Sequence, residues 1–222
     1  MSFMHERVEN EKPEVEENKE TSRIGAMRSR KFYFNGLDVA TIAVFASLTG
    51  VFSAYIASLN IFLGLTGFWY EQIFQGLYMV FIIVAAYLIR KPGAGVLTGA
   101  ISGIIEFFAG NPLGVIIIPY GLFEGLGVDI GFSLFRYKRF DSLAFFVAGG
   151  MWFLTIFYTI YAFGVEWMPL TTPILWLLFA VSQILSGGIL GGLVAKIIAT
   201  TLDKSGLTQK YLGVSRRLDG KK

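Results

Sequence analysis

The sequence contains no cysteine and only one histidine, His5, which lies in the charged N-terminal segment. Without cysteine, the chain forms no disulfide and offers no thiolate as metal ligand or nucleophile. Without a histidine past residue 5, the remainder cannot supply a serine–histidine dyad or an H-E-x-x-H zinc site. A phosphate-binding loop of the G-x-x-x-x-G-K-[ST] type is also absent. The sequence therefore predicts neither an enzyme nor a cofactor, and any ATP hydrolysis must come from another polypeptide.

Positive charge is scarce in the middle of the chain. Between residues 32 and 195 there are five Lys or Arg residues, Arg90, Lys91, Arg136, Lys138 and Arg139. The chain is 54% hydrophobic, and its mean hydropathy is +0.60. A helix that crosses a bilayer needs about 20 mostly apolar residues. Six stretches approach that length: 37–58, 72–89, 94–109, 113–135, 143–164 and 172–201. We therefore predict an all-α integral membrane protein with six transmembrane helices in a domain spanning residues 32–205.

The two ends of the chain differ from this domain. Residues 1–31 carry seven acidic and seven basic residues and no long apolar run, which is typical of a disordered tail. Residues 206–222 are predicted to form a basic cytoplasmic tail. The net charge of +3 is explained by cytoplasmic loops and not by binding of nucleic acid.

The basic residues also predict the topology, because Lys and Arg collect in cytoplasmic loops. They precede the first span, separate spans two and three, separate spans four and five, and follow span six. The opposite loops, 59–71, 110–112 and 165–171, contain no Lys or Arg. Both termini are therefore expected in the cytoplasm of a multi-pass protein of the cell membrane.

Polar and aromatic side chains gather in the outer half of the predicted bundle. An ionisable group in a bilayer is costly and is usually kept for a pathway or a site, so Glu106 and Glu124 are the leading candidates. The alternative is a protonated carboxyl bonded to a neighbouring helix, and for Asp129 this is at least as plausible as a ligand role. Taken singly, the aromatic residues fit an interfacial belt. Together, these groups suit a planar, nitrogen-rich or cationic ring. The candidate binding residues are Glu106, Glu124, Gln72, Gln75, Trp69, Tyr70, Tyr120 and Trp176.

Small residues at helical spacing form two ridges, which allow close approach of helix backbones. The first span carries Ala46, Gly50 and Ala54, and a competing ridge holds Ala43 and Ser47. The last span carries Gly187, Gly191, Ala195 and Ala199. For the last span we favour packing within the bundle, whereas for the first span a partner subunit is nearly as plausible.

A set of short motifs in order resembles a known family. The chain has Gln75-Gly76-Leu77-Tyr78, Arg90-Lys91-Pro92-Gly93-Ala94, Glu106, Tyr120-Gly121-Leu122-Phe123-Glu124-Gly125-Leu126-Gly127 and Phe135-Arg136-Tyr137-Lys138-Arg139. Over residues 36–203 it is similar to the substrate-binding S component of energy-coupling factor (ECF) transporters, and most similar to the YkoE-type component for thiamine or hydroxymethylpyrimidine.

The resemblance implies a six-helix bundle that captures a vitamin from outside. It implies partnership with a transmembrane coupling subunit and two cytoplasmic ATPases. In that family, small residues on the first helix dock on the coupling subunit, which points to Ala46, Gly50 and Ala54. The resemblance also implies a pocket in which Glu106 and Glu124 meet an aminopyrimidine or thiazolium and Trp69, Tyr70 and Trp176 stack. Two alternatives stay open: a component for another vitamin such as riboflavin or biotin, or a structural membrane protein.

Overall fold

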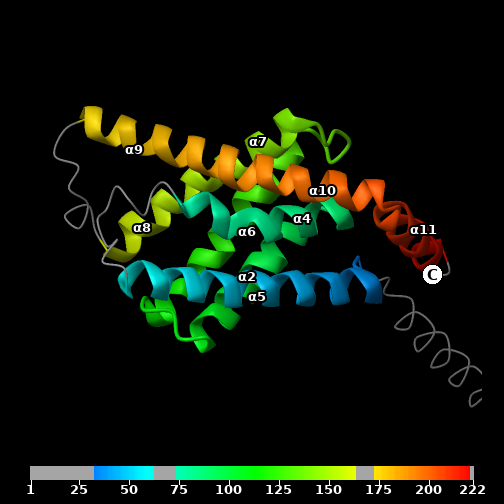
Figure 1. The fold of residues 1–222 in the computed structure, drawn as a ribbon, viewed down its shortest axis with the longest axis horizontal. Helices are drawn as coiled ribbons and strands as arrows, with labels where there is room; N and C mark the ends of the chain where they lie inside the picture. The colour runs from blue at the N-terminus through cyan, green and yellow to red at the C-terminus, as the bar shows by residue number, and fades with distance from the viewer. Residues whose placement is uncertain (1–32, 63–73, 164–172, 221–222) are drawn as a thin grey trace, which may run out of the picture. The chain divides into compact units, whose positions relative to one another are not determined.

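The computed structural model describes residues 33–62, 74–163 and 173–220, and every element in this part of the chain is helical. The expectation of an all-α protein is thereby confirmed. In chain order the elements are α2 (Gly36–Phe62), the 3₁₀-helix η1 (Gln75–Met79), α4 (Val80–Ile89), α5 (Ala94–Phe108), the 3₁₀-helix η2 (Gly114–Ile116), α6 (Ile117–Leu134), α7 (Ser142–Gly150), the 3₁₀-helix η3 (Met151–Leu154), α8 (Thr155–Phe163), α9 (Pro173–Ser186), the π-helix η5 (Gly187–Leu193), α10 (Val194–Lys204) and α11 (Leu207–Gly220). Figure 1 shows α2 and the continuous α9–η5–α10 helix running lengthwise through the bundle.

Four helical segments are long and apolar enough to cross a membrane: Gly36–Leu59, Gly114–Leu134, Ser142–Tyr161 and Pro173–Lys204. Two further apolar helices, Gln75–Ile89 and Ala94–Phe108, are shorter. All six coincide with the predicted stretches, but the number of spans stays a prediction because two of them fall below the usual spanning length.

The core is centred on α4, whose residues are all buried except Phe81. A helix that is apolar all round is expected in the interior of a bundle. Phe132 of α6, Phe145 of α7 and Trp152 of η3 pack into the same cluster. The core therefore places α4 between α2 and the helices that follow α6.

Glycine brings α5 and α6 together. Gly95, Gly99 and Gly103 of α5 face Gly121 and Gly125 of α6, and a Cβ at Gly99 would lie 2.2 Å from the Gly121 carbonyl oxygen. Such contacts need the absence of a side chain on both helices. This ridge was not identified from the sequence, although it fixes the position of Glu106 and Glu124 on the same two helices.

The predicted ridge of the last span does pack within the bundle. A Cβ at Gly187 would lie 2.2 Å from the Gly149 carbonyl oxygen, and one at Gly191 would lie 2.7 Å from that of Gly76. These contacts fall in the π-helix η5, where the wider helical turn meets η1 and α7. Packing inside the chain, the interpretation we favoured for this span, is confirmed.

The ridge of the first span requires a correction. Ala46, Gly50 and Ala54 are buried, and a Cβ at Gly50 would lie 2.7 Å from the Ser102 carbonyl oxygen of α5. The chain itself covers this face, so it does not offer these residues to a partner. The competing ridge is the exposed one: Ala43 and Ser47 line a shallow apolar groove with Val44, Leu48, Val51 and Phe81.

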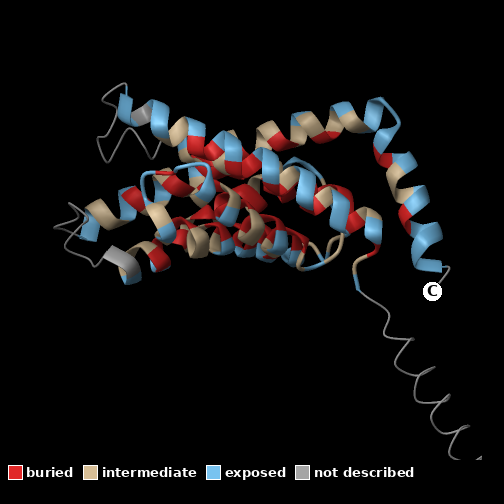
Figure 2. Cartoon of the chain, turned by 90° about the horizontal axis from the view of Figure 1, so that it is seen from below, coloured by how far each residue is buried: buried red, intermediate tan, exposed pale blue. Residues whose placement is uncertain are grey.

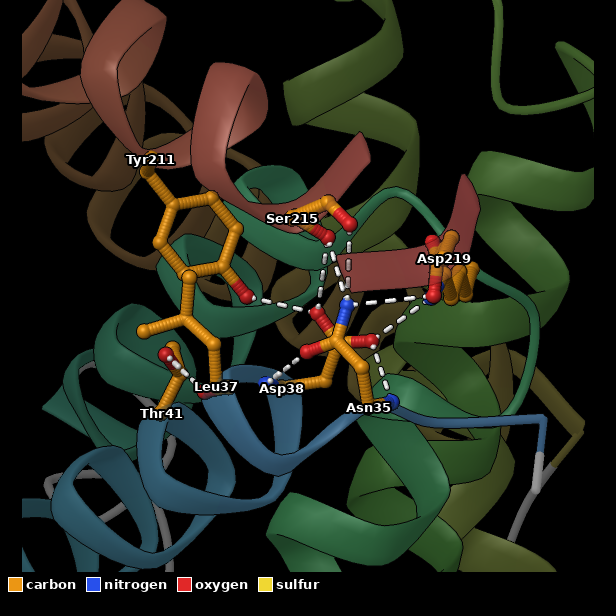
Figure 3. A network of polar contacts seen from close by, with 8 residues as sticks. Asn35, Leu37, Asp38, Thr41, Tyr211, Ser215 and Asp219 are labelled. Atoms are coloured by element: carbon orange, nitrogen blue, oxygen red, sulfur yellow. Dashed lines mark hydrogen bonds and ion pairs between the residues drawn. The ribbon is translucent and has the colours of Figure 1, made fainter. Parts of the chain in front are cut away.

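The C-terminal segment also differs from its prediction as a tail. It forms α11, which belongs to the same compact unit as the bundle, Phe34–Lys221. Tyr211 of α11 donates a hydrogen bond to Asp38 Oδ1 at 2.8 Å, and Asn35 Nδ2 donates to Ser215 Oγ at 2.8 Å (Figure 3). Polar side chains more than 170 positions apart in sequence thus hold the helix in place.

Candidate functional site

Three helical segments, the 3₁₀-helices η1 and η3 and the α-helix α9, meet at one glutamine. Gln75 opens η1, and its Oε1 accepts hydrogen bonds from Trp152 Nε1 of η3 at 3.0 Å and from Gln183 Nε2 of α9 at 3.5 Å. Trp152 and Gln183 are 1% and 3% exposed. Buried polar groups are usually paired by hydrogen bonds. The triad of Gln75, Trp152 and Gln183 therefore links three parts of the chain at one point.

Aromatic rings extend from this triad along α6 and α8. Tyr120 lies edge to face with Trp152 at 5.8 Å between ring centroids, and with Tyr158 at 6.1 Å. Tyr78 stacks on Trp152, with 6.4 Å between ring centroids. The Tyr120 hydroxyl donates to Thr155 Oγ1 at 3.5 Å. These contacts build a wall of flat faces and hydroxyl groups, which suits contact with a planar ring.

Two glutamates lie on α5 and α6, and one of them, Glu124, follows Tyr120 of this wall. Glu106, near the end of α5, accepts a hydrogen bond from Asn111 Nδ2 at 2.6 Å. Glu124 is one helical turn after Tyr120 on α6 and is 5% exposed. Among the described residues its carboxyl group makes no hydrogen bond, and it is close enough to Glu106 for their charges to interact. Two buried acids so placed cannot both be ionised cheaply, and a cation or a hydrogen-bond donor between them relieves that cost.

Asp129, also on α6, has a different environment. Its carboxyl accepts hydrogen bonds from the backbone N–H groups of Gly95 at 3.1 Å and Val96 at 2.8 Å, and from the Tyr137 hydroxyl. The first turn of a helix leaves such N–H groups without partners inside the helix. Asp129 thus caps α5, which supports the structural interpretation over a ligand role.

The structure brings together four of the candidate binding residues: Gln75, Tyr120, Glu106 and Glu124. Trp176 is half-buried and packs instead with Ile156 and Phe179. Trp69, Tyr70 and Gln72 lie outside the described residues.

Trp152 and Thr155 were missed by sequence reasoning. Tryptophan is common at membrane interfaces, but Trp152 lies near the middle of the stretch 143–164. This central position, away from both ends of the stretch, was the sequence signal that could have identified Trp152. Gln183 was noticeable only as a carboxamide deep in the last span, and its contact with Gln75 over 108 positions follows from the fold.

Comparison with known proteins gives consistent results. Residues 37–156 match the family described as the permease component of ABC-type cobalt transport systems. The chain is 31% identical over 139 residues to the putative HMP/thiamine permease protein YkoE of Bacillus subtilis (strain 168), over 62% of this chain and 68% of that protein.

A solved structure described as an S-component of an ECF transporter has the same fold. It superposes with a TM-score of 0.70 at 26% identity, over 83% of this chain and 95% of the other. The shared fold, the sequence match and the arrangement of polar groups agree with one another. The chain therefore belongs to the family of YkoE-like S components, the substrate-binding membrane subunits of ECF transporters.

Proposed function

We propose that this S component captures thiamine or its hydroxymethylpyrimidine precursor from outside the cell for an ATP-driven importer. The observation that carries the proposal is the buried Glu124 carboxyl, which has no hydrogen-bond partner among the described residues and lies beside Glu106 and the Tyr120–Trp152 wall. The name of the Bacillus subtilis relative, an HMP/thiamine permease, supports the same cargo.

The chemistry of the site matches an aminopyrimidine. The exocyclic amine of such a ring donates hydrogen bonds, and Glu124 and Glu106 accept them. The flat ring would lie against Tyr120, which is half-buried, and Trp152, which is 1% exposed, would support Tyr120 from within the bundle. If the ligand is thiamine, the same two acids balance the thiazolium charge. Trp69, Tyr70 and Gln72 remain candidates for the outer wall of this site, and Trp176 for a more distant contact.

The partners that we propose rest on two grounds, the family of the chain and the exposed surface of α2. We infer that a transmembrane coupling subunit docks on the exposed groove of α2 at Ala43 and Ser47, and that two cytoplasmic ATPases supply the energy. Small side chains permit close contact between helices in a bilayer, and this ridge is exposed whereas Ala46 and Gly50 are covered. Both termini would face the cytoplasm, since the basic loops lie at the end of the bundle where α2 begins and α10 ends.

Ligand binding tests the cargo. The purified protein should bind hydroxymethylpyrimidine or thiamine at submicromolar concentration without ATP, and binding should change the fluorescence of Trp152. Riboflavin, biotin and Co²⁺ serve as comparison ligands, the last because of the matched family's description. If neither pyrimidine compound binds while one of the others does, the cargo is wrong. If none of them binds to well-folded protein, an S component without these cargoes or a structural protein is favoured.

Co-purification tests the docking surface. Ser47→Leu should reduce recovery of the coupling subunit while leaving ligand binding intact, because it fills an exposed groove. Ser133→Leu on α6, which is also exposed, is the matched control. Gly50→Leu should instead reduce the yield of folded protein, since its side chain collides with α5. Normal recovery with Ser47→Leu would assign docking to another face.

A further inference from the structure

Helix α11 begins at the boundary of the membrane-spanning part. The last candidate span ends at Lys204, and α11 starts at Leu207, after a turn at Gly206 with φ of +73°. Figure 2 shows α11 running crosswise to α10, at the end of the chain marked C. A helix that turns sideways where a span ends is placed to lie along the membrane surface, as amphipathic interfacial helices do.

The polar contacts of α11 fix its rotation. Lys91 Nζ, in the loop between α4 and α5, lies 2.7 Å from Asp38 Oδ2 and 2.9 Å from Asp219 Oδ2. Together with the hydrogen bonds of Tyr211 and Ser215, these ion pairs hold one side of α11 against the first turn of α2 (Figure 3). Because α2 enters its candidate span at Gly36, α11 lies level with that membrane boundary.

The side of α11 next to these contacts is apolar and exposed. Leu207, Val214 and Leu218 are 54%, 42% and 38% exposed. At 3.6 residues per turn, positions spaced by seven and four residues fall on one stripe. Lys210 and Arg217 lie along the edge of the stripe that faces away from the bundle, and Arg216 lies on the opposite side of the helix.

We propose that α11 is an interfacial helix that binds anionic lipid headgroups. The stripe of Leu207, Val214 and Leu218 enters the acyl region of the cytoplasmic leaflet, and Lys210 and Arg217 contact the headgroups. Basic residues beside an apolar stripe are the pattern by which amphipathic helices select an anionic surface. The bundle lies on one side of the stripe and the two basic residues lie on the other. An anionic membrane surface accounts for both features, because its acyl region covers the stripe and its headgroups contact the basic residues. The assignment concerns lipid and does not depend on the vitamin.

Because the native chain has no cysteine, single spin labels can be placed without background. Val214→Cys and Arg216→Cys label the stripe and the opposite side of α11 in the full-length protein. Each is reconstituted in nanodiscs of phosphatidylcholine alone and of equal parts phosphatidylcholine and phosphatidylglycerol. Collision rates with oxygen, which concentrates in lipid, and with a water-soluble nickel chelate report the surroundings of each label.

In the mixed nanodiscs the label at 214 should favour oxygen over the chelate several-fold, and the label at 216 should show the reverse. Lys210→Glu combined with Arg217→Glu should move the label at 214 toward water in the mixed nanodiscs only. Leu207→Cys provides a second position on the stripe if the label at 214 perturbs the fold. Vitamin binding should be unchanged in all variants, so failure of this proposal is distinguishable from failure of the proposed function.

Three results would overturn the proposal. Equal access of the chelate to 214 and 216 in both lipid mixtures would place α11 in water. Identical values at 214 with and without phosphatidylglycerol would exclude selection of anionic headgroups. Protection of 214 only after addition of the coupling subunit and ATPases would assign the stripe to a protein partner.

Discussion

Buried acids at the two ends of the bundle are held very differently. Where α2 and α5 begin, Asp38 is paired with Lys91, Tyr211 and the Asn35 backbone N–H, and Asp129 accepts from two backbone N–H groups and a tyrosine. In the opposite half of the bundle, Glu106 accepts from Asn111, and Glu124 has no hydrogen-bond partner among the described residues. All four are less than 8% exposed. The four acids are therefore alike in burial and differ in the number of their partners, and we use that number to predict which of them contact a ligand.

The difference follows from the cost of burying a polar group. A buried acid that accepts several hydrogen bonds recovers most of its lost hydration, and removing it leaves donors unsatisfied. A buried acid without partners has not recovered that cost and persists where a ligand supplies the missing donors. The comparison predicts opposite effects of the same substitution on one helix, since Asp129 and Glu124 both lie on α6.

The largest expected effect is on stability at Asp129. Asp129→Ala should lower the free energy of unfolding by about 3 kcal/mol, because it leaves two backbone N–H groups and a tyrosine hydroxyl without their acceptor. Glu124→Ala, the matched control, should leave stability unchanged or slightly raised. Unfolding in mixed detergent and SDS micelles, followed by circular dichroism, measures both. Equal destabilisation by the two substitutions would remove the distinction between the two acids.

Binding should be affected most at Glu124. Glu124→Gln keeps the size of the side chain and removes a charged acceptor, so ligand affinity should fall about ten- to a hundredfold, the value of a charge-assisted hydrogen bond. Calorimetric titration with hydroxymethylpyrimidine and thiamine measures the change. Tyr161→Phe is the control, because that side chain is 87% exposed on the same half of the bundle. If Glu124→Gln lowers the yield of folded protein as much as binding, the acid is structural.

A smaller loss of affinity is expected at Glu106. Glu106→Gln should weaken binding by about tenfold or less, because the amide oxygen still accepts from Asn111 and only the charge is lost. The double variant Glu106→Gln with Glu124→Gln, measured in the same titrations, determines whether the two acids act together. Strict additivity of the two losses would mean that they contact the ligand independently.

Sequence patterns predicted the apolar segments and selected four residues that the candidate site contains, for physical reasons that can be named. Depth and polarity identified Gln75, Glu106, Tyr120 and Glu124, because polar groups are rare in apolar stretches. The breaks in the last two spans, at η3 and η5, stand at Gly-Gly pairs that the sequence shows at 149–150, 187–188 and 191–192. The distant segments that these glycines contact could not be read from the sequence. Likewise, the first helix offers small residues on two ridges, and the sequence alone does not show that α5 covers Ala46 and Gly50. The polar segment after residue 206 forms a helix whose contacts with Asp38, Asn35 and Lys91 span the length of the domain and could not be read from the sequence.

The smallest expected effect concerns the pH dependence of the polar contacts of α11. Burial lowers the pKa of Lys91, but hydrogen bonds and charge from Asp38 and Asp219 outweigh it, so the pKa is raised above 10.5. Burial and Asp38 also raise the pKa of Tyr211 above its ordinary 10.0. A group whose pKa is raised by folding stabilises the folded state fully below its unfolded pKa, and this contribution disappears as the pH rises through the folded pKa. The contribution of these two residues should therefore be constant at neutral pH and decline in the alkaline range above pH 10.

Lys91→Arg measures the share of this loss of stability that comes from Lys91. Arginine stays protonated across that range, so the variant should lose stability less steeply than the native chain, by about 1 kcal/mol or less for a partly exposed ion pair. Lys138→Arg, in the exposed loop after α6, should leave the slope unchanged, and Tyr211→Phe should remove the tyrosine's share. Thermal unfolding at a series of pH values measures the slopes. An unchanged slope in both Lys91→Arg and Tyr211→Phe would show that α11 is held by packing rather than by its charges, and would weaken the contrast between the paired Asp38 at this end of the bundle and Glu124 in the opposite half.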